Sequence, residues 1–169
     1  MAVEKNIDKI LFDVCKAFNS EGISYVLIGG WAVIIHGFPR LTNDIDFLIE
    51  DSDENIRKIK NVLRKIFNDK SIDEIKHHDI AEYSVVRYVS PDGVSIDLMA
   101  RIGNVADFKS LSKHIVQFEV LGNEIPVLDV EALIKLKDTI RDKDKMDLAF
   151  LKEKLKKRSG ILKIKQPLN

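Results

Sequence analysis

ISYVLIGGWAVIIHGFPRLTNDIDFLI, residues 23–49, is the stretch that decides the fold of this chain. It opens with an apolar run typical of a buried strand, which leads into Gly29 and Gly30. A short apolar segment and a Gly-Phe-Pro turn follow, and a second strand then carries Asp44 and Asp46 at alternate positions. This order predicts a ligand site where the acidic strand passes the glycine pair.

Asp44 and Asp46 project from one face of their strand, because side chains alternate between the two faces of a strand. Two carboxylates buried side by side repel each other and are costly to desolvate without compensating positive charge. Divalent cations that prefer hard oxygen ligands, such as Mg²⁺, supply that charge. Gly29 and Gly30 let the backbone approach a ligand closely, at a helix start where free N–H groups favour an anion. A phosphate site beside a carboxylate metal site predicts phosphoryl or nucleotidyl transfer.

A third acid, Asp97, lies in a hairpin predicted further along the chain. Two alternating strands, residues 82–89 and 94–99, flank Ser90-Pro91-Asp92-Gly93, a sequence typical of tight turns. If the second of these strands lies beside the strand of Asp44 and Asp46, the three carboxylates converge on one face. The alternative is an acid on the solvent-facing side of an edge strand.

GGWAVIIHG at residues 29–37 and RLTNDIDFLI at residues 40–49, followed by the later strand with Asp97, resemble the nucleotidyltransferase superfamily related to DNA polymerase β. The antibiotic-type, minimal and AbiEii-like branches are the most similar. The resemblance implies an α+β nucleotidyltransferase fold, a mixed β-sheet flanked by helices with a C-terminal helical segment. It implies that Asp44, Asp46 and Asp97 are the catalytic and metal-binding residues. The nucleotide-binding residues that it implies are Gly29, Gly30, Arg40, Thr42, Lys137 and Lys143.

The two lysines come from residues 133–148, which look like the C-terminal helical segment of the AbiEii-like branch. In that branch a lysine and a Lys-Asp pair face the nucleotide cleft, so Lys137, Lys143 and Asp144 are candidates for phosphate contact or for cleft architecture. The alternative is that these side chains form surface ion pairs at helical spacing. Position 30 is Gly where many members have a phosphate-contacting Ser, which leaves base and sugar selectivity open.

The implied reaction moves an NMP group from an NTP to an acceptor hydroxyl and releases pyrophosphate. Two Mg²⁺ or Mn²⁺ ions, held by Asp44 and Asp46, would stabilise the attacking and leaving oxygens. Asp97 would bind the ion nearest the acceptor and help remove the acceptor's proton. Arg40 would neutralise phosphate charge, unless it pairs with a neighbouring acid. The acceptor is unidentified: a small molecule, RNA or a protein hydroxyl.

Three other functions remain open. A catalytically silent member would bind a nucleotide or a partner, for example as a component of a toxin–antitoxin pair. A glycosyltransferase also uses Asp-x-Asp, but it normally has a larger nucleotide-binding sheet ahead of that motif. A purely structural domain would have to explain why two acids open an otherwise apolar strand.

Composition places the chain among globular proteins. Its 169 residues predict one domain, with a core at about 1–128, C-terminal helices at about 129–158 and a basic tail at 159–169. A hydrophobic content of 45% excludes a disordered chain. Lys+Arg and Asp+Glu both number 27, so no overall basic charge attracts nucleic acid.

No apolar run long enough for a membrane span and no signal peptide is visible, so we expect a cytoplasmic protein without membrane contact. The single Cys15 excludes an internal disulfide. The short chain leaves little room for a separate acceptor domain, so we expect either that a second subunit in a homodimer completes the cleft or that a large partner presents the acceptor.

The remaining sequence predicts ordinary elements around this centre. Apolar periodicity indicates a helix at residues 4–21 and another at 54–67, the second capped by Asp51-Ser52-Asp53. Residues 68–79 are polar and predict a loop with one or two irregular turns, in which His77 and His78 are solvated. A hairpin at residues 115–128, a helix capped by Asp129 and a helix at 143–157 complete the chain.

Overall fold

The computed structural model describes residues 6–83, 85–104, 106–136 and 142–164. Its main sheet is mixed and six-stranded, in the order β3-β4-β2-β1-β8-β7. The strands of this sheet are β1 (Tyr25–Ile28), β2 (Asp44–Ile49), β3 (Val86–Val89), β4 (Ser95–Met99), β7 (Ile115–Val120) and β8 (Asn123–Leu128). Two short strands, β5 (Arg101–Ile102) and β6 (Ala106–Asp107), pair separately. The predicted mixed sheet is confirmed, with β2 and β1 in its middle.

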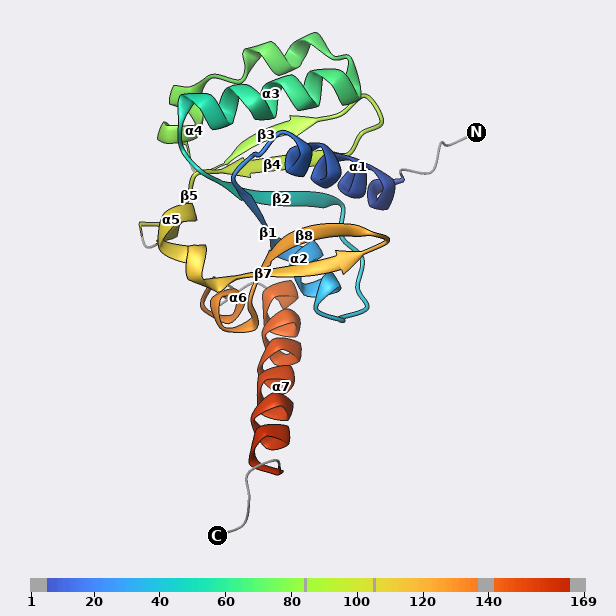
Figure 1. Ribbon diagram of the computed structural model, residues 1–169, viewed down its shortest axis with the longest axis vertical. Coiled ribbons are helices and arrows are strands. Elements are labelled where there is room, and N and C mark those ends of the chain that lie inside the picture. Colours follow the sequence, from blue (N-terminus) through green and yellow to red (C-terminus); the bar gives the residue numbers. More distant parts are fainter. Residues whose placement is uncertain (1–5, 84, 105, 137–141, 165–169) are drawn as a thin grey trace.

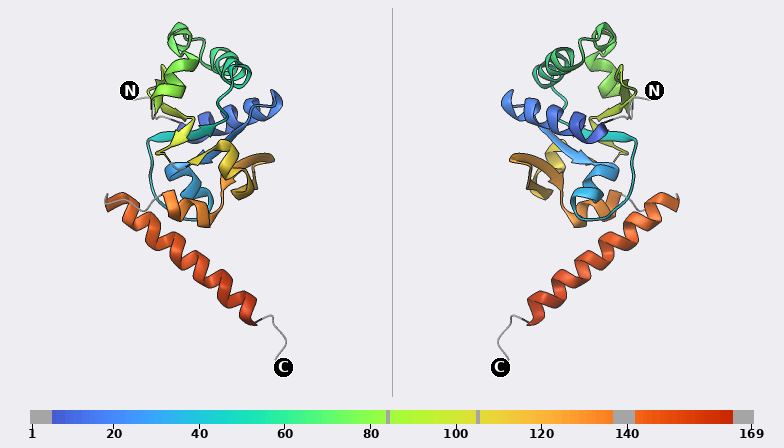
Figure 2. Two further views of the ribbon diagram at one scale, coloured as in Figure 1. Left: turned by 90° about the vertical axis from the view of Figure 1, so that its left-hand side faces the viewer. Right: turned by 90° about the vertical axis from the view of Figure 1, so that its right-hand side faces the viewer.

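Helices lie on both faces of the sheet (Figure 1 and Figure 2). α1 (Ile7–Ser20) and α3 (Asp53–Phe67) pack against each other on one face, and α2 (Gly29–Ile35) contacts β1 and β2 from the other. The remaining helical segments are η1 (Lys70–Glu74), α4 (His77–Glu82), α5 (Phe108–Leu111), η2 (Ser112–His114), α6 (Val130–Leu136) and α7 (Asp142–Ile164). Of the helices in the described residues, none has the length and apolar character needed to cross a membrane.

The C-terminal helical segment is present and longer than predicted. α7 packs against α6, and its C-terminal half extends away from the sheet (Figure 2). It continues to Ile164, beyond the predicted end at residue 157, so part of the expected tail is helical. Leu148 and Leu151 are buried and anchor the N-terminal half of the helix.

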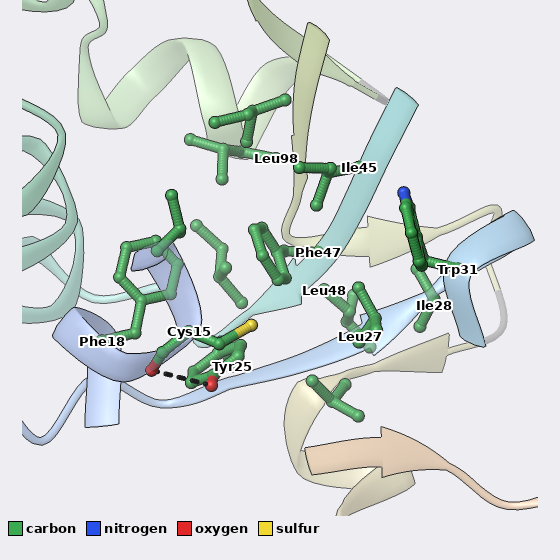
Figure 3. Packing of buried hydrophobic residues seen from close by; sticks show 14 of the residues in the cluster. Cys15, Phe18, Tyr25, Leu27, Ile28, Trp31, Ile45, Phe47, Leu48 and Leu98 are labelled. Carbon is green, nitrogen blue, oxygen red and sulfur yellow. Dashed lines mark hydrogen bonds between the residues drawn. The ribbon is translucent and has the colours of Figure 1, made fainter. Parts of the chain in front are cut away.

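The two faces of β2 carry different kinds of side chain, because residues alternate along a strand. Phe47 is fully buried, and its ring centroid lies 5.4 Å from those of Phe18 on α1 and Tyr25 on β1 (Figure 3). Truncating a buried aromatic side chain to alanine costs ~3–5 kcal/mol, so this face of β2 is strongly held. Asp44 and Asp46 consequently emerge on the opposite face, where α2 lies.

Both predicted hairpins form, but the first begins later than the sequence suggested. β3 pairs antiparallel with β4, and β7 pairs antiparallel with β8. The prediction of a strand from residue 82 is wrong, because Glu82 ends α4 and β3 starts only at Val86. The loop with irregular turns predicted at residues 68–79 contains η1, which is such a turn, but the start of α4 at His77 was not predicted. The apolar residues Ile72, Ile75 and Ile80 are buried beneath these segments.

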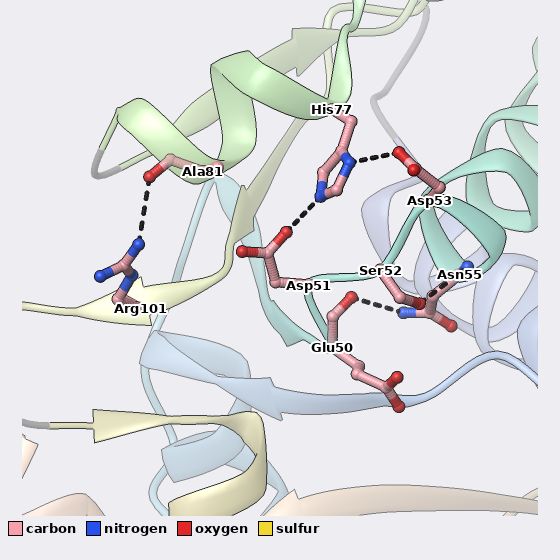
Figure 4. A network of polar contacts seen from close by, with 8 residues as sticks. All are labelled: Glu50, Asp51, Ser52, Asp53, Asn55, His77, Ala81 and Arg101. Carbon is pink, nitrogen blue, oxygen red and sulfur yellow. Dashed lines mark hydrogen bonds and ion pairs between the residues drawn. The ribbon is translucent and has the colours of Figure 1, made fainter.

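His77 differs from its prediction as a solvated residue. Its Nε2 lies 2.5 Å from Asp51 Oδ1, and its Nδ1 contacts Asp53 Oδ1 (Figure 4). These acids flank Ser52, whose hydroxyl caps α3 by accepting a hydrogen bond from the Asn55 N–H. The hydrogen bond to Asp51, and then the contact with Asp53, raise the pKa of His77 above its ordinary value. The protonated ring therefore ties the start of α4 to the start of α3.

We expect the contribution of His77 to stability to disappear in alkaline solution. Since the folded-state pKa is raised, the contribution is fully present below the unfolded pKa of about 6.5 and is lost as pH rises through the folded pKa. His77→Gln should lower the melting temperature by about 1–3 °C at about pH 5.5 and leave it unchanged at about pH 9.5. Thermal unfolding at the two pH values measures this. His78→Gln, at a neighbouring exposed ring that contacts neither Asp51 nor Asp53, is the control, and an equal pH-dependent loss there would contradict the assignment.

The junction of β1 and α2 has room only for glycine. Gly29 has φ +70°, and a Cβ on it would lie 2.2 Å from Asp46 Oδ2 and 2.8 Å from Asp46 Cγ. Gly22, between α1 and β1, has a similar φ of +66° but no atom within 4 Å of its ideal Cβ. The Asp46 carboxylate therefore lies directly against the Gly29 backbone.

Gly29→Ala and Gly22→Ala should separate backbone strain from this contact. Both substitutions place a Cβ at positive φ, which costs ~1–2 kcal/mol. Only Gly29→Ala must also displace Asp46, so we expect its loss of unfolding free energy to exceed that of Gly22→Ala by ~1 kcal/mol or more. Urea denaturation of both variants measures the difference. Equal losses would mean that Asp46 moves aside at no cost.

Candidate active site

A cavity of about 570 Å³ opens at the sheet beside β2 and the start of α2. Seven of the predicted site residues line it: Gly29, Gly30, Arg40, Thr42, Asp44, Asp46 and Asp97. Lys137 lies outside the described residues, and so do the side chains of Lys143 and Asp144, although their backbone belongs to α7. All predicted site residues whose side chains the structure describes thus line this cavity.

Strand pairing puts the three acids on one face. β2 pairs parallel with β4, with Asp46 opposite Asp97 and Asp44 opposite Ser95. Residues that pair directly in adjacent strands share a face of the sheet, so Asp97 joins Asp44 and Asp46. The alternative of an exposed acid on an edge strand is wrong, because β4 lies between β2 and β3 and Asp97 is only 5% exposed.

The glycine pair is packed against other residues of the site. Asp46 lies against Gly29, as described above. At Gly30 a Cβ would lie 2.9 Å from Thr42 Oγ1 and 3.2 Å from Arg40 Nη1. Thr42 and Arg40 therefore reach the cavity wall at the start of α2, and a side chain at position 30 would push them away.

Arg40 is held by an acid distant in the sequence. Its Nη1 donates to Asp147 Oδ2 over 2.7 Å, and the Asp147 side chain is 1% exposed. Removing one partner of a buried pair costs ~3–5 kcal/mol, because the other charge is left uncompensated. Arg40 therefore pairs with an acid, as the alternative prediction stated, and it also lines the cavity. The same pair fixes α7 beside the site.

Arg87 on β3 is a site residue that sequence reasoning missed. Its Nε donates to Asp97 Oδ1 over 2.8 Å and its Nη2 to Asp97 Oδ2 over 2.9 Å. The same Nη2 lies 3.5 Å from Asp44 Oδ2. The hydrogen bonds to Asp97, and then the attraction of Asp97 and Asp44, raise the pKa of Arg87 further above its ordinary value. One guanidinium thus contacts carboxylates from two strands, β2 and β4.

The acids fit a divalent cation by chemistry but are not arranged around one. Asp44, Asp46 and Asp97 offer the carboxylate oxygens that Mg²⁺ and Mn²⁺ prefer. Among the described residues, however, no three His, Cys, Asp or Glu side chains form a group that could hold a metal ion. Arg87 already contacts both carboxylate oxygens of Asp97. Positive charge at the acids is therefore supplied by the protein itself in this arrangement.

Apolar side chains also line the cavity. They are Val85, Met99, Ile102, Leu133 and Leu136. These residues come from β4, β5, α6 and the segment before β3, so the cavity brings together parts distant in the sequence. The cavity consequently combines the charged side chains of the site with apolar ones.

Comparisons with known proteins identify the family and the fold. A sequence model of the family described as "Nucleotidyl transferase AbiEii toxin, Type IV TA system" matches residues 9–153. A candidate nucleotidyltransferase from Thermotoga maritima superposes with a TM-score of 0.58 at 17% identity, over 95% of this chain and 92% of that chain. The lincosamide antibiotic adenylyltransferase LnuA, with lincomycin bound, gives a TM-score of 0.57 at 18% identity, over 89% of this chain and 97% of that chain.

An antigenic nucleotidyltransferase-like protein from Paracoccidioides brasiliensis is also similar, with a TM-score of 0.51 at 17% identity over 85% of this chain and 74% of that chain. No curated protein sequence matches the chain. At these identities the structural likeness shows the fold, which is that of nucleotidyltransferases. The family match spans the glycine pair, the three acids and Asp147, and the protein therefore belongs to the AbiEii nucleotidyltransferase family.

Proposed function

We propose that the protein transfers an NMP group from an NTP to an acceptor hydroxyl, with release of pyrophosphate, and that the reaction depends on Mg²⁺ or Mn²⁺. The observation that supports this most is the row formed by Asp46 and Asp97 on paired strands, with Asp44 beside them, in a cavity that also contains the glycine pair. A nucleotidyltransferase family and fold give the same class of reaction.

Each residue has a distinct part in the proposed reaction. Asp44, Asp46 and Asp97 would hold the divalent ions, whose charge stabilises the attacking and leaving oxygens. Asp97 accepts the proton of the acceptor hydroxyl. Gly29 and Gly30, which have no side chains to obstruct it, let the triphosphate reach the backbone.

Cationic side chains complete the phosphate site. Arg40, oriented by its hydrogen bond to Asp147, neutralises phosphate charge, and Thr42 offers a hydroxyl beside it. Lys137 and Lys143 are proposed as further phosphate contacts on the family resemblance alone. We thus assign binding of the triphosphate to Arg40 and the two lysines, and binding of the metal ions to the three acids.

We propose that the acceptor packs against the apolar side chains that line the cavity, because the glycine pair and Arg40 are assigned to the triphosphate. LnuA, a fold neighbour, is a lincosamide adenylyltransferase, so a small-molecule acceptor is one candidate, beside RNA and a protein hydroxyl. We propose that a second copy of the chain, or the acceptor itself when it is large, covers the cavity. Light scattering of the purified chain distinguishes a dimer from a monomer.

A second candidate function is supported by the family description. AbiEii proteins are described as toxins of type IV toxin–antitoxin systems, so the protein is also a candidate toxin component. A silent member would bind a nucleotide without transferring it, whereas an active toxin would carry out the transfer proposed here. A glycosyltransferase is less well supported, since the similar folds belong to nucleotidyltransferases.

Asp44→Asn should remove the metal-dependent part of nucleotide binding. In the unchanged protein we expect an NTP with Mn²⁺ at about 100 times the dissociation constant to raise the melting temperature by roughly 5 °C or more. The variant should keep only the shift seen with NTP in the absence of metal. Asp8→Asn, which removes an exposed carboxylate of α1, is the matched control and should behave as the unchanged protein. An undiminished shift in Asp44→Asn would count against this metal site.

Transfer itself is tested with each α-³²P-labelled NTP and a cell extract. Incorporation of label into RNA, protein or small molecules identifies the acceptor class. We expect incorporation to require Mg²⁺ or Mn²⁺ and to be lost in Asp46→Asn. Nucleotide binding without incorporation into any fraction would favour the silent member.

A further inference from the structure

Arg87 contacts the acids of the candidate metal site from a neighbouring strand. It pairs directly with Asp97 across β3 and β4, and its fork engages both carboxylate oxygens over 2.8 and 2.9 Å. It also approaches Asp44, with Nη2 at 3.5 Å from Oδ2. A bidentate arginine–carboxylate pair of this kind is among the stronger hydrogen-bonded pairs in proteins. The guanidinium therefore sits where positive charge compensates the acids.

The Asp97 carboxylate is buried, and the Arg87 side chain lies between it and solvent. The Asp97 side chain is 7% exposed, whereas the Arg87 side chain is 53% exposed. β3 is the end strand of the main sheet, so the arginine can leave Asp97 for solvent without disturbing the core. A long side chain with its charged end in water reorients at low cost. Access of an ion to Asp97 consequently depends on Arg87 moving.

We propose that Arg87 and a divalent cation compete for Asp97, so that the guanidinium neutralises the acids in the metal-free protein and is displaced when the ion binds. This inference rests on the proposed function, in which the acids bind that ion. The physical cause is repulsion, since a dication and a guanidinium at the same carboxylate interact unfavourably in the low dielectric of a partly buried site. Arg87 thereby acts on the metal site through Asp97, by occupying the two carboxylate oxygens that the ion would bind.

Two other roles of Arg87 predict different effects on metal binding. If Arg87 only fastened β3 to β4, its contacts with Asp97 would persist with metal bound, and metal affinity would not depend on its charge. If it oriented Asp97 for the ion, its removal would weaken metal binding. Competition alone predicts tighter binding when the charge is removed.

The first measurement is Mn²⁺ binding to the full chain without nucleotide, followed by electron paramagnetic resonance. Arg87→Gln should bind Mn²⁺ about tenfold more tightly than the unchanged protein, the effect of ~1.4 kcal/mol of relieved repulsion. Arg87→Lys keeps the charge and should remain within about threefold of the unchanged protein. Arg57→Gln, which removes an exposed arginine of α3 outside this cavity, controls for net charge and should leave the affinity unchanged.

The second measurement is thermal unfolding with and without Mn²⁺, which also detects a variant that folds poorly. Without metal, Arg87→Gln should melt below the unchanged protein, because Asp97 loses its partner. Saturating Mn²⁺ should narrow this gap, since the ion replaces the lost charge. A purely structural role would leave the gap the same.

The outcomes separate the two proposals. Tighter Mn²⁺ binding by Arg87→Gln together with a narrowed gap supports competition. Equal or weaker binding by Arg87→Gln, while the unchanged protein binds Mn²⁺ in a manner lost in Asp44→Asn, overturns the competition and leaves the proposed function standing. Absence of Mn²⁺ binding in both proteins overturns the metal site itself and the competition with it.

Discussion

The register in which β2 pairs with its two neighbours is the constraint on which the site depends. Asp46 lies opposite Ile28 on β1 and opposite Asp97 on β4, so one row across the sheet joins the glycine corner to the third acid. A slip of one residue in β2 would send its acids to the other face, against Phe18 and Tyr25, and would move Phe47 out of the core. The burial of Phe47 opposes that slip, and the energy of the core thereby determines where the acids emerge.

Charge balance at the site depends on two arginines with different surroundings. Arg40 is 18% exposed and pairs with a side chain of α7 that is almost completely buried, so the pair is part of the packed structure. Arg87 is half exposed and pairs with an acid of the site itself. The first pair connects α7 to the segment before β2, and the second covers the carboxylate of Asp97. The same residue type thus belongs to the buried packing in one pair and is half exposed to solvent in the other.

Much of the fold and most of the site were predictable because their signals are local. The order of strand, glycine pair, helix and acidic strand lies within residues 23–49, and the Ser90–Gly93 turn predicts the strand that carries Asp97. Counting back from that turn would also place Arg87 opposite Asp97, but only once the turn is known to pair Val89 with Ser95. A different turn would put another residue there, so the sequence pattern alone did not single out Arg87.

Other contacts had no local signal at all. Arg40 and Asp147 are 107 residues apart, and their pairing follows from the way α7 packs on the body. His77 reaches Asp51 and Asp53 because α4 folds over the start of α3, and α4 itself was hidden in a polar stretch with few apolar residues. Long-range packing decides such contacts, and periodicity does not report it.

The missing side chain at Gly29 has a consequence for how this cavity could be re-engineered. A Cβ there would lie 2.2 Å from Asp46 Oδ2, so a substitution at this position also disturbs an acid of the site. The cavity is lined as well by ordinary apolar side chains such as Met99, Ile102 and Leu136, each exchangeable for another of different size. Redesign of this chain for a new acceptor is therefore best begun at the apolar side chains, where a change of shape leaves the acids in place.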